Sequence, residues 1–444
     1  MRKTALLSGF LVLCFIAARP LQGNAPPNVL LIVSDDHAWS DYGFMGHPVV
    51  RTPSLDRLAA EGMLYTRGYV PTAVCRPSLA ALLTGRYPQQ HGITGNDPPG
   101  GRAAMFDPVR RATMVEIFRR SKVLPALLAA KGYVSFQSGK WWEGRPQDSG
   151  FTAAMTHGDV TRRGRHGDDG LKIGREGLQP IYDFIDSTGG KPFFVWYAPL
   201  LPHTPHTPPD RLLKKYQTLD LAPPVARYYA MIEWLDETVG QLLDHLDRKG
   251  LRENTIVLYV ADNGWIQPPD PNPQQPTRAK MSPYDAGIRT PVIIRWPGHT
   301  DRKRDEKTLV GSIDVMPTLL RAAGITPPSD LPGIDLLDAR ALARRKMLFG
   351  SLSVHTAVDV TSPVANLKYR YAIRADGWKL TLPFTPNRDA PLTIDGRTAD
   401  WMRFEPELYN VLADPLEEKN RAAERPDLVK TLRAAIDGWW RVPQ

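Results

Sequence analysis

Cysteine is nearly absent from this sequence, which holds two cysteines, Cys14 and Cys75, among 444 residues. A disulfide-rich secreted scaffold is therefore excluded, because such small folds depend on several bridges. The chain also lacks a Gly-X-Y period, which excludes a collagen-like fibre. Because 42% of the residues are hydrophobic and 23% are charged, the composition is not that of a mainly disordered protein either.

Long apolar runs are also scarce. The most marked one, Ala5–Ala18, follows Arg2 and Lys3 and has 14 residues, which are too few to span a bilayer comfortably. This arrangement predicts a signal peptide over residues 1–24, and hence a secreted or periplasmic protein. An N-terminal membrane anchor is the alternative for the same segment. No later stretch is apolar enough for a stable transmembrane anchor.

The charge balance is modestly basic, with a formal net charge of +9. Removal of the N-terminal segment would take away Arg2, Lys3 and Arg19 and leave a charge nearer +6, because no acidic residue precedes Asp35. A basic excess suits an anionic substrate or partner, although solubility alone would also explain it. The basic residues are scattered and form no recognised nucleic-acid motif, so no nucleic-acid partner is expected.

Proline and glycine, by contrast, are abundant, with 42 and 35 residues, and they indicate many loops. Short apolar runs alternate with helical patterns, which predicts an α/β fold with a large, doubly wound, mixed or parallel sheet flanked by helices. The predicted strands are Asn28–Ser34, Tyr133–Gln137, Phe193–Ala198, Thr255–Ala261 and Pro291–Trp296. The predicted helices are Ser54–Glu61, Ser78–Leu83, Val123–Lys131, Leu178–Ser187, Val225–Lys249 and Val315–Ala323.

The pattern changes after about residue 350 to short strands and a final helix: Tyr369–Arg374, Trp378–Leu382 and Asp427–Trp439. We therefore expect a large domain over residues 25–350 and a smaller C-terminal α+β subdomain over residues 351–444. Three irregular segments are interpreted as loops around a pocket. They are Asp97–Arg120, Gly144–Glu176 and Gln267–Pro276.

Polar residues follow three of the predicted strands: Asp35 and Asp36, then Gly139 and Lys140, then Asp262 and Asn263. In open α/β sheets ligands collect at the carboxyl ends of strands, so these groups are expected to share one site. Three carboxylates and an amide oxygen are hard ligands that suit Ca²⁺ or Mg²⁺ rather than Zn²⁺. An isolated Asp-Asp pair is commonly a turn or a helix cap, but two such sets at strand ends favour a metal site.

Cys75 precedes the predicted helix Ser78–Leu83, where the helix dipole is positive and backbone N–H groups are free. This placement favours an anion beside Cys75 or a thiolate at it, and a small buried residue at a turn is the alternative. Lys140 and Lys280 are point charges able to hold an anionic group. His203 is pinned between prolines and could protonate a leaving group, whereas a lone loop histidine usually faces solvent.

Several motifs of the chain resemble, in order, those of the type I sulfatases of the alkaline-phosphatase superfamily. The similarity runs from about residue 27 to the C-terminus. It is carried by NVLLIVSDDHAWSDYG, RTPSLDRLAAEGMLYTRGYV, CRPSLAALLTGRYPQQHGI, SGKWWEG, LPHTP, ADNG, KMSPYDAGIRTPVIIRWPG and ELYNVLADPLEEKN. The resemblance implies an alkaline-phosphatase-like fold, a catalytic domain over residues 25–350, and hydrolysis of sulfate esters.

The resemblance also implies a mechanism. In the family a maturation enzyme oxidises the signature cysteine to formylglycine, whose hydrated aldehyde has two hydroxyls on one carbon. One hydroxyl attacks sulfur, and the other then loses its proton, so that the aldehyde re-forms and sulfate leaves. Carried over by motif, Cys75 is the formylglycine position, Lys140 and Lys280 hold the sulfate, and His203 faces the leaving group. The metal, Ca²⁺ or alternatively Mg²⁺, would be bound by Asp35, Asp36, Asp262 and Asn263.

Two positions depart from the family pattern. The signature normally reads Cys-x-Pro-Ser-Arg, but Leu79 replaces the arginine, which in the family helps the maturation enzyme recognise its target. The Gly-Lys-Trp motif usually continues with a histidine that is a base for re-forming the aldehyde, but Trp142 stands there. His37 and His91 lie in motifs that adjoin the site and are the candidates for a substitute base.

The leading hypothesis is therefore an exported sulfatase acting on sulfated carbohydrate. Five loop arginines could bind an anionic glycan through bidentate contacts, or they could form only a solvated basic loop. They are Arg145, Arg162, Arg163, Arg165 and Arg175. A second hypothesis is a phosphate or phosphonate ester hydrolase with the same nucleophile and metal. A third is a protein that binds sulfated glycans without hydrolysing them, although the complete set of oxygen ligands argues against it.

Overall fold

The computed structural model of the protein describes residues 25–162, 164–271, 277–384, 386, 393–394, 397–399 and 402–443. The predicted signal peptide, residues 1–24, lies outside the described residues, as do Arg163 and residues 272–276 of the predicted loop. Within the described part, no helix is both long and apolar enough to cross a membrane.

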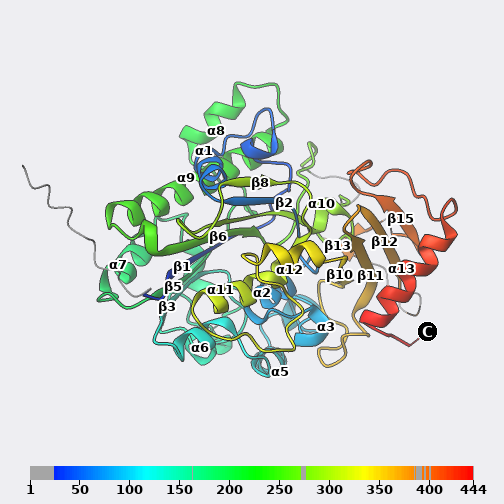
Figure 1. The fold of residues 1–444 in the computed structure, drawn as a ribbon, viewed down its shortest axis with the longest axis horizontal. Helices are drawn as coiled ribbons and strands as arrows, with labels where there is room; N and C mark the ends of the chain where they lie inside the picture. Colours follow the sequence, from blue (N-terminus) through cyan, green and yellow to red (C-terminus); the bar gives the residue numbers. More distant parts are fainter. Residues whose placement is uncertain are drawn as a thin grey trace, which may run out of the picture.

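A nine-stranded sheet runs through the larger part of the molecule (Figure 1). Its strands are β1 (Asn28–Ser34), β2 (Met63–Tyr69), β3 (Val134–Gly139), β4 (Ala153–Ala154), β5 (Phe193–Ala198), β6 (Thr255–Ala261), β7 (Arg289–Arg295), β8 (Lys303–Asp305) and β9 (Val310–Gly311). Strands β4-β3-β5-β1-β6 pair in parallel, and β7 runs antiparallel to both β6 and β2. The predicted mixed α/β sheet is confirmed.

Helices cover both faces of this sheet because successive side chains of a strand point to opposite faces. Leu31 and Val33 of β1 belong to one core with α2 (Cys75–Thr84), α6 (Leu124–Ala129) and α11 (Val315–Ala322). Leu30 and Ile32 belong to the core on the other face. That face is covered by α1 (Pro53–Glu61), α7 (Gln179–Ser187) and α9 (Pro223–Arg248), as Figure 1 shows.

Several elements differ from the sequence prediction, among them a helix, a strand and the start of a helix. The segment 97–120, expected to be a loop, contains α5 (Pro108–Arg119), whose first turn is capped by the Asp107 carboxylate. Strand β2 was not predicted, because its sequence MLYTRGY mixes apolar and polar residues. Helix α2 begins three residues earlier than predicted, so Cys75 is its first residue instead of preceding it.

The C-terminal part holds a second sheet. Its antiparallel strands β10 (Met347–Ser353), β11 (Leu367–Arg374), β12 (Trp378–Pro383) and β15 (Glu407–Asn410) lie in that order, with α13 (Pro426–Trp439) packed against them. The short pair β13 (Thr393–Ile394) and β14 (Arg397–Thr398) lies apart. The described helices not yet mentioned are α3 (Pro88–His91), α4 (Gly101–Ala104), α8 (Asp210–Gln217), α10 (Asp285–Ile288) and α12 (Ala339–Arg344).

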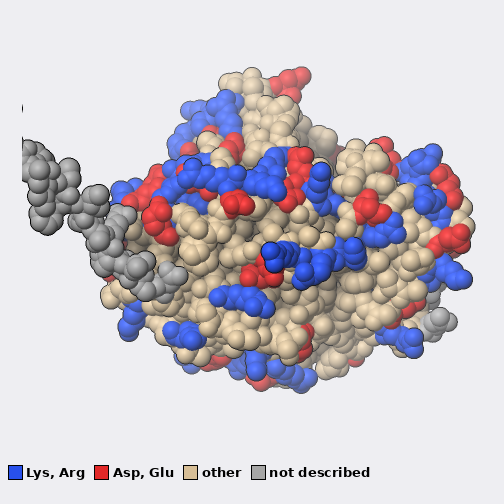
Figure 2. All heavy atoms as spheres, viewed as in Figure 1, with Lys and Arg blue, Asp and Glu red and all other residues tan. Residues whose placement is uncertain are grey.

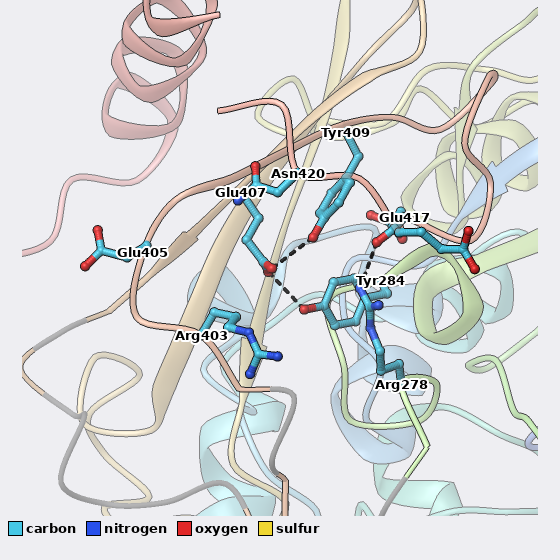
Figure 3. Close-up of a pocket in the computed structure, with 9 residues that line it drawn as sticks. Arg278, Tyr284, Arg403, Glu405, Glu407, Tyr409, Glu417 and Asn420 are labelled. Carbon is cyan, nitrogen blue, oxygen red and sulfur yellow. Dashed lines mark hydrogen bonds between the residues drawn. The ribbon is translucent and has the colours of Figure 1, made fainter. Parts of the chain in front are cut away.

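A cavity of about 280 Å³ lies where the C-terminal sheet meets the segment before α10 (Figure 3). The carboxylate of Glu407 accepts hydrogen bonds from the hydroxyls of Tyr284 and Tyr409, both at 2.9 Å. Arg278 stacks over the Tyr284 ring at 3.7 Å and donates to the Glu417 carbonyl at 3.0 Å. These polar groups therefore bind one another and hold the two parts of the protein together.

A buried charge cluster lies beside this cavity. Lys379 of β12 pairs with Asp285 of α10 at 3.1 Å and with Glu417 at 2.7 Å. Burial, together with the charge of Asp285 and against the attraction of Lys379, raises the pKa of Glu417 to about 7 from an ordinary value of 4.5. Two buried carboxyls thus share one lysine, and one of them retains its proton more readily.

We expect this cluster to make stability depend on pH. Since the folded protein holds the Glu417 proton more tightly than the unfolded chain does, the stabilisation is complete below pH 4.5 and is lost as the pH rises through 7. Between pH 5.5 and 8 the unfolding free energy of the wild type should fall by about 2 kcal/mol relative to Glu417→Gln. Urea denaturation at both pH values measures this, with the exposed neighbour Glu418→Gln as the control. If the difference in unfolding free energy between the wild type and Glu417→Gln were the same at both pH values, the prediction would be contradicted.

The charges on the surface are dispersed. On the face shown in Figure 2, lysines and arginines lie in several groups with acidic and uncharged residues between them. This matches their scattered distribution along the sequence.

Candidate active site

The polar residues predicted at the strand ends do meet in the structure. Because β1 and β6 pair in parallel, with Ser34 beside Ala261, the residues that follow them emerge side by side. Strand β3 runs parallel to these two on the far side of β5 and brings Lys140 to the same edge. The parallel order of the sheet thus assembles the site from segments more than 100 residues apart.

Four side chains form a tight, buried cluster: Asp35, Asp36, Cys75 and Asp262, with ligand atoms all within 4.8 Å of one another. Each of these residues is at most 3% exposed. The Oδ2 atoms of Asp35 and Asp262 accept no hydrogen bond, although buried carboxylate oxygens rarely lack a partner. An oxygen-rich donor set with two such free oxygens fits a hard divalent cation such as Ca²⁺.

Asn263 lies at the edge of this cluster. Its amide nitrogen donates to Asp36 Oδ1 at 2.7 Å, and its Oδ1 atom accepts from the Cys75 thiol at 3.4 Å. The backbone N–H of Asp36 donates to Asp262 Oδ1 at 3.1 Å, which Asp36 reaches in the left-handed conformation with φ of 56°. These contacts hold the predicted metal ligands together.

Two lysines border the carboxylates. Lys140 Nζ is 2.6 Å from Asp35 Oδ1, and Lys280 Nζ is 2.7 Å from Asp36 Oδ2. Burial alone would lower the pKa of each ammonium, but the neighbouring carboxylates outweigh it, and the pKa of both lysines lies above its usual range. Both therefore carry a positive charge at neutral pH, as holding an anion requires.

The carboxyls respond unequally to this environment. Burial and the neighbouring Asp35 raise the pKa of Asp262 to about 7. Burial also acts on Asp36, but Lys280, His203 and Lys140 outweigh it and hold the pKa of Asp36 well below its usual range. The carboxyls repel one another across the cluster, and a bound cation would relieve that repulsion.

His203 lies at the mouth of the cluster, with a side chain 23% exposed compared with 3% for Lys140. Its Nε2 atom is 3.4 Å from both Lys280 Nζ and Asp36 Oδ2. Its Nδ1 atom lies 2.6 Å from the Thr204 carbonyl, so Nδ1 carries the proton that this carbonyl accepts. Burial lowers the pKa of His203 to about 4. The geometry thus turns Nε2 toward the charged groups.

The chain matches two family models. The model described as sulfatase covers residues 27–325, and the model described as N-sulphoglucosamine sulphohydrolase, C-terminal, covers residues 279–436. The chain belongs to the sulfatase family. The predicted family and the predicted enzyme class, a sulfuric ester hydrolase, are therefore confirmed.

Individual relatives agree with this assignment. The N-acetylgalactosamine-6-sulfatase of Canis lupus familiaris is 32% identical over 382 residues, which cover 76% of this sulfatase and 71% of that protein. The crystal structure of Ps i-CgsB shares the fold, with a TM-score of 0.71, 21% identity and 94% of both chains covered. The phosphonate monoester hydrolase of Agrobacterium radiobacter shares the fold too, with a TM-score of 0.64, 18% identity and 92% and 96% coverage.

The two departures from the sulfatase pattern are both buried. Leu79 is a residue of α2 that packs into the core, and the Trp142 ring lies 5.2 Å from Lys140 Nζ, in cation–π contact. Neither side chain can take over the role of the polar residue that it replaces. Trp142 is 4% exposed.

The histidines considered as substitute bases are held by other contacts. The His37 ring nitrogens lie 3.1 Å from the Asp41 carbonyl and 3.2 Å from the Tyr259 hydroxyl. His91 accepts the Ile93 N–H at Nδ1, and burial lowers the pKa of both histidines to about 3. Both ring nitrogens of His37 are thus occupied away from the carboxylate cluster.

His166, which no sequence motif marked, lies beside the residues that follow Lys140. Its carbonyl accepts the Trp141 N–H at 3.1 Å, and its ring is 5.7 Å from the Trp142 ring. Burial, followed by the charges of Arg165 and Lys140, lowers its pKa to about 3. His166 belongs to the irregular segment Gly144–Glu176, in which the spacing of residues does not indicate which side chains lie near the site.

Arg76, the residue after Cys75, makes a contact that the sequence did not indicate. Its guanidinium binds both carboxylate oxygens of Glu143, at 2.8 and 2.6 Å, and both side chains are buried. The pair joins the start of α2 to the segment that carries Lys140. It therefore sets the distance between the Cys75 helix turn and one of the two lysines.

We expect Glu143→Gln to destabilise the fold by about 3 kcal/mol, because it leaves the buried Arg76 charge uncompensated. Glu116→Gln is the matched control, since its pair with Arg119 is largely exposed and should change the unfolding free energy by less than about 0.5 kcal/mol. Chemical denaturation of the two variants measures both values. Equal effects would show that the Arg76 pair is no stronger than a surface pair.

The loop arginines proposed as glycan ligands divide into two groups. Arg145 and Arg162 are exposed, as a ligand for a glycan must be. Arg165 instead binds the buried Asp97 carboxylate through both ends of its guanidinium fork. Arg175 donates to backbone carbonyls of the loop that carries His203. For these last two, the structure corrects the interpretation as free or solvated basic side chains.

Proposed function

We propose that this sulfatase hydrolyses sulfate esters of carbohydrate through a formylglycine made from Cys75 and a bound Ca²⁺, with Mg²⁺ as the alternative. The observation that carries the proposal is the position of Cys75. It is the first residue of α2, and its sulfur lies within 4.8 Å of ligand atoms of three carboxylates. A group formed there would adjoin both the cation and the two lysines.

The surroundings of Cys75 favour a modified residue over a thiolate nucleophile. Burial raises the pKa of the Cys75 thiol to about 12, so an unmodified thiol would remain protonated at neutral pH. A protonated thiol is a poor nucleophile. The hydrated aldehyde of a formylglycine supplies a hydroxyl nucleophile at the same carbon instead. A maturation enzyme is accordingly a required partner.

The other residues have distinct proposed roles. A cation held by Asp35, Asp36, Asp262 and Asn263 supplies Lewis-acid stabilisation of charge on the sulfate oxygens. Lys140 and Lys280 hold those oxygens through charge-assisted hydrogen bonds. His203, at the more exposed side of the cluster, takes up a second proton at Nε2 from solvent and passes it to the departing oxygen, because Nδ1 is committed to the Thr204 carbonyl and the ring of the free site is neutral.

A carbohydrate substrate is supported by what the relatives' names say of them. One relative is an N-acetylgalactosamine-6-sulfatase, and Ps i-CgsB was also solved in complex with k-i-k-neocarrahexaose. The exposed Arg145 and Arg162 offer planar donors for an anionic sugar. The proposed location is outside the cytoplasm, on the basis of the signal-like segment 1–24. The proposed layout is a catalytic domain to residue 350 followed by a C-terminal subdomain.

Mass spectrometry of the peptide that contains Cys75 tests the proposal directly. The protein should be produced in its own host or with a matching maturation enzyme, and its peptide should have the mass of formylglycine. The same preparation should release sulfate from 4-nitrophenyl sulfate faster than phosphate from 4-nitrophenyl phosphate. An unmodified thiol in an active preparation would contradict the nucleophile, and a phosphate preference of orders of magnitude would contradict the substrate. Sulfated-glycan binding without sulfate release by aldehyde-bearing protein would indicate a binding protein.

A further inference from the structure

The loop that carries His203 is irregular. Residues 199–209 form no helix or strand, and one isolated bridge, between Asp35 and Pro202, joins the loop to the sheet. Within the loop, the His203 ring contacts only the adjacent Thr204, through its Nδ1 atom. A proton donor must be held close to one geometry to act, so this loop needs support from another element.

Arg175 supplies that support. Its Nε and Nη2 atoms donate to the Leu200 carbonyl at 2.9 and 2.7 Å, and Nη2 also donates to the His203 carbonyl at 2.9 Å. Nη1 and Nη2 both donate to the Pro205 carbonyl at 3.2 Å, and Nη1 reaches Thr207 Oγ1 at 3.3 Å. One guanidinium therefore binds the loop before His203, at it and after it.

The chemistry of this contact is specific to arginine. Among the described residues, Arg175 has no carboxylate within ion-pair distance, and its donors are directed at backbone carbonyls. Its guanidinium also lies 5.8 Å from the Trp234 ring of α9. A rigid fork of five N–H donors can bind several carbonyls at once, whereas a lysine ammonium is a point charge on a flexible stem.

We propose that Arg175 is a positioning residue that holds the His203 loop so that Nε2 faces the leaving group. This inference rests on the proposed function, because it assigns Arg175 to the step in which His203 gives a proton to the departing oxygen. Arg175 itself touches neither the carboxylate cluster nor the lysines in the described contacts. It acts through the carbonyls on both sides of His203.

The proposal predicts a dependence on the leaving group. 4-Nitrophenolate leaves readily without a proton, whereas the more basic phenolate of phenyl sulfate benefits from one. Arg175→Ala should therefore lower kcat/KM for phenyl sulfate by about 10²-fold, within the range of general-acid effects, and for 4-nitrophenyl sulfate by less than about 3-fold. His203→Ala should show the same selectivity, and the double variant should be no worse than His203→Ala alone.

Two further variants complete the test. Arg175→Lys keeps the charge but cannot bind carbonyls on both sides of His203, so it should show a smaller loss with the same selectivity; it also serves if Arg175→Ala does not fold. Arg248→Ala, at the exposed end of α9, is the control and should leave both rates unchanged.

The outcomes separate this inference from the function on which it rests. Equal losses on both substrates in both Arg175 variants, or additive losses in the double variant, would overturn the positioning role while leaving the sulfatase active. Failure of the aldehyde-bearing wild type to release sulfate from either ester would overturn the proposed function and this inference with it.

Discussion

Replacing Cys75 with alanine is expected to lower kcat/KM for sulfate release at least about 10⁴-fold. Alanine has no group that a maturation enzyme could oxidise to an aldehyde, so the nucleophile is lost while the small side chain still fits the buried site. The initial rate on 4-nitrophenyl sulfate, with protein produced beside a matching maturation enzyme, measures the effect.

The same variant separates catalysis from folding. The carboxylates, both lysines and His203 do not depend on the sulfur for their mutual contacts. The thermal unfolding midpoint and the affinity for inorganic sulfate should therefore stay close to those of the wild type. Residual turnover within 10-fold of the wild type would show that Cys75 is not the source of the nucleophile.

Replacing Asp262 with asparagine is expected to remove the metal and to lower kcat/KM roughly 10³-fold. The change takes one negative charge from the buried cluster, where Asp262 Oδ2 is one of the two oxygens without a hydrogen-bond partner. It also removes a carboxylate 3.5 Å from Lys140 Nζ. Elemental analysis of the purified protein and the initial rate on 4-nitrophenyl sulfate measure both losses.

The control for this prediction is Asp301→Asn, which makes the same chemical change at an exposed position. It should retain metal, rate and the rise in unfolding temperature that added Ca²⁺ produces by binding the folded state. Treatment of the wild type with EDTA should reproduce the Asp262→Asn loss, and added Ca²⁺ should restore the rate. An Asp262→Asn protein with full metal content and full rate would exclude this residue as a ligand.

The strands show how far local pattern predicts this fold. β1, β5 and β6 have the predicted bounds, because each is a continuous apolar run and a strand buried on both faces needs exactly that composition. β2 escaped prediction because it carries Arg67 in a buried position. Its Nη1 atom donates to the carbonyls of Lys307 and Ala375, which lie far along the chain and which no local pattern reveals.

In the site, too, local sequence patterns predicted some features, and contacts between distant segments determined the others. The residues predicted at strand ends converge because parallel strands present their carboxyl ends at one edge, which is a consequence of the predicted fold class. Their assigned roles in metal binding and catalysis stay predictions. His166 and the Arg76–Glu143 pair could not be predicted, because each contact joins residues far apart in the sequence and no local pattern tells which side chains will meet.

By itself the sequence determined five of the nine strands of the large sheet, the cluster of charged strand ends and the sulfatase family, because apolar runs, the residues that follow them and contiguous motifs are all local properties of the chain. The tertiary structure alone decided which charges pair with one another. It turned Arg165 toward Asp97 and Arg175 toward the carbonyls around His203, since a buried guanidinium must find acceptors wherever the packed backbone provides them.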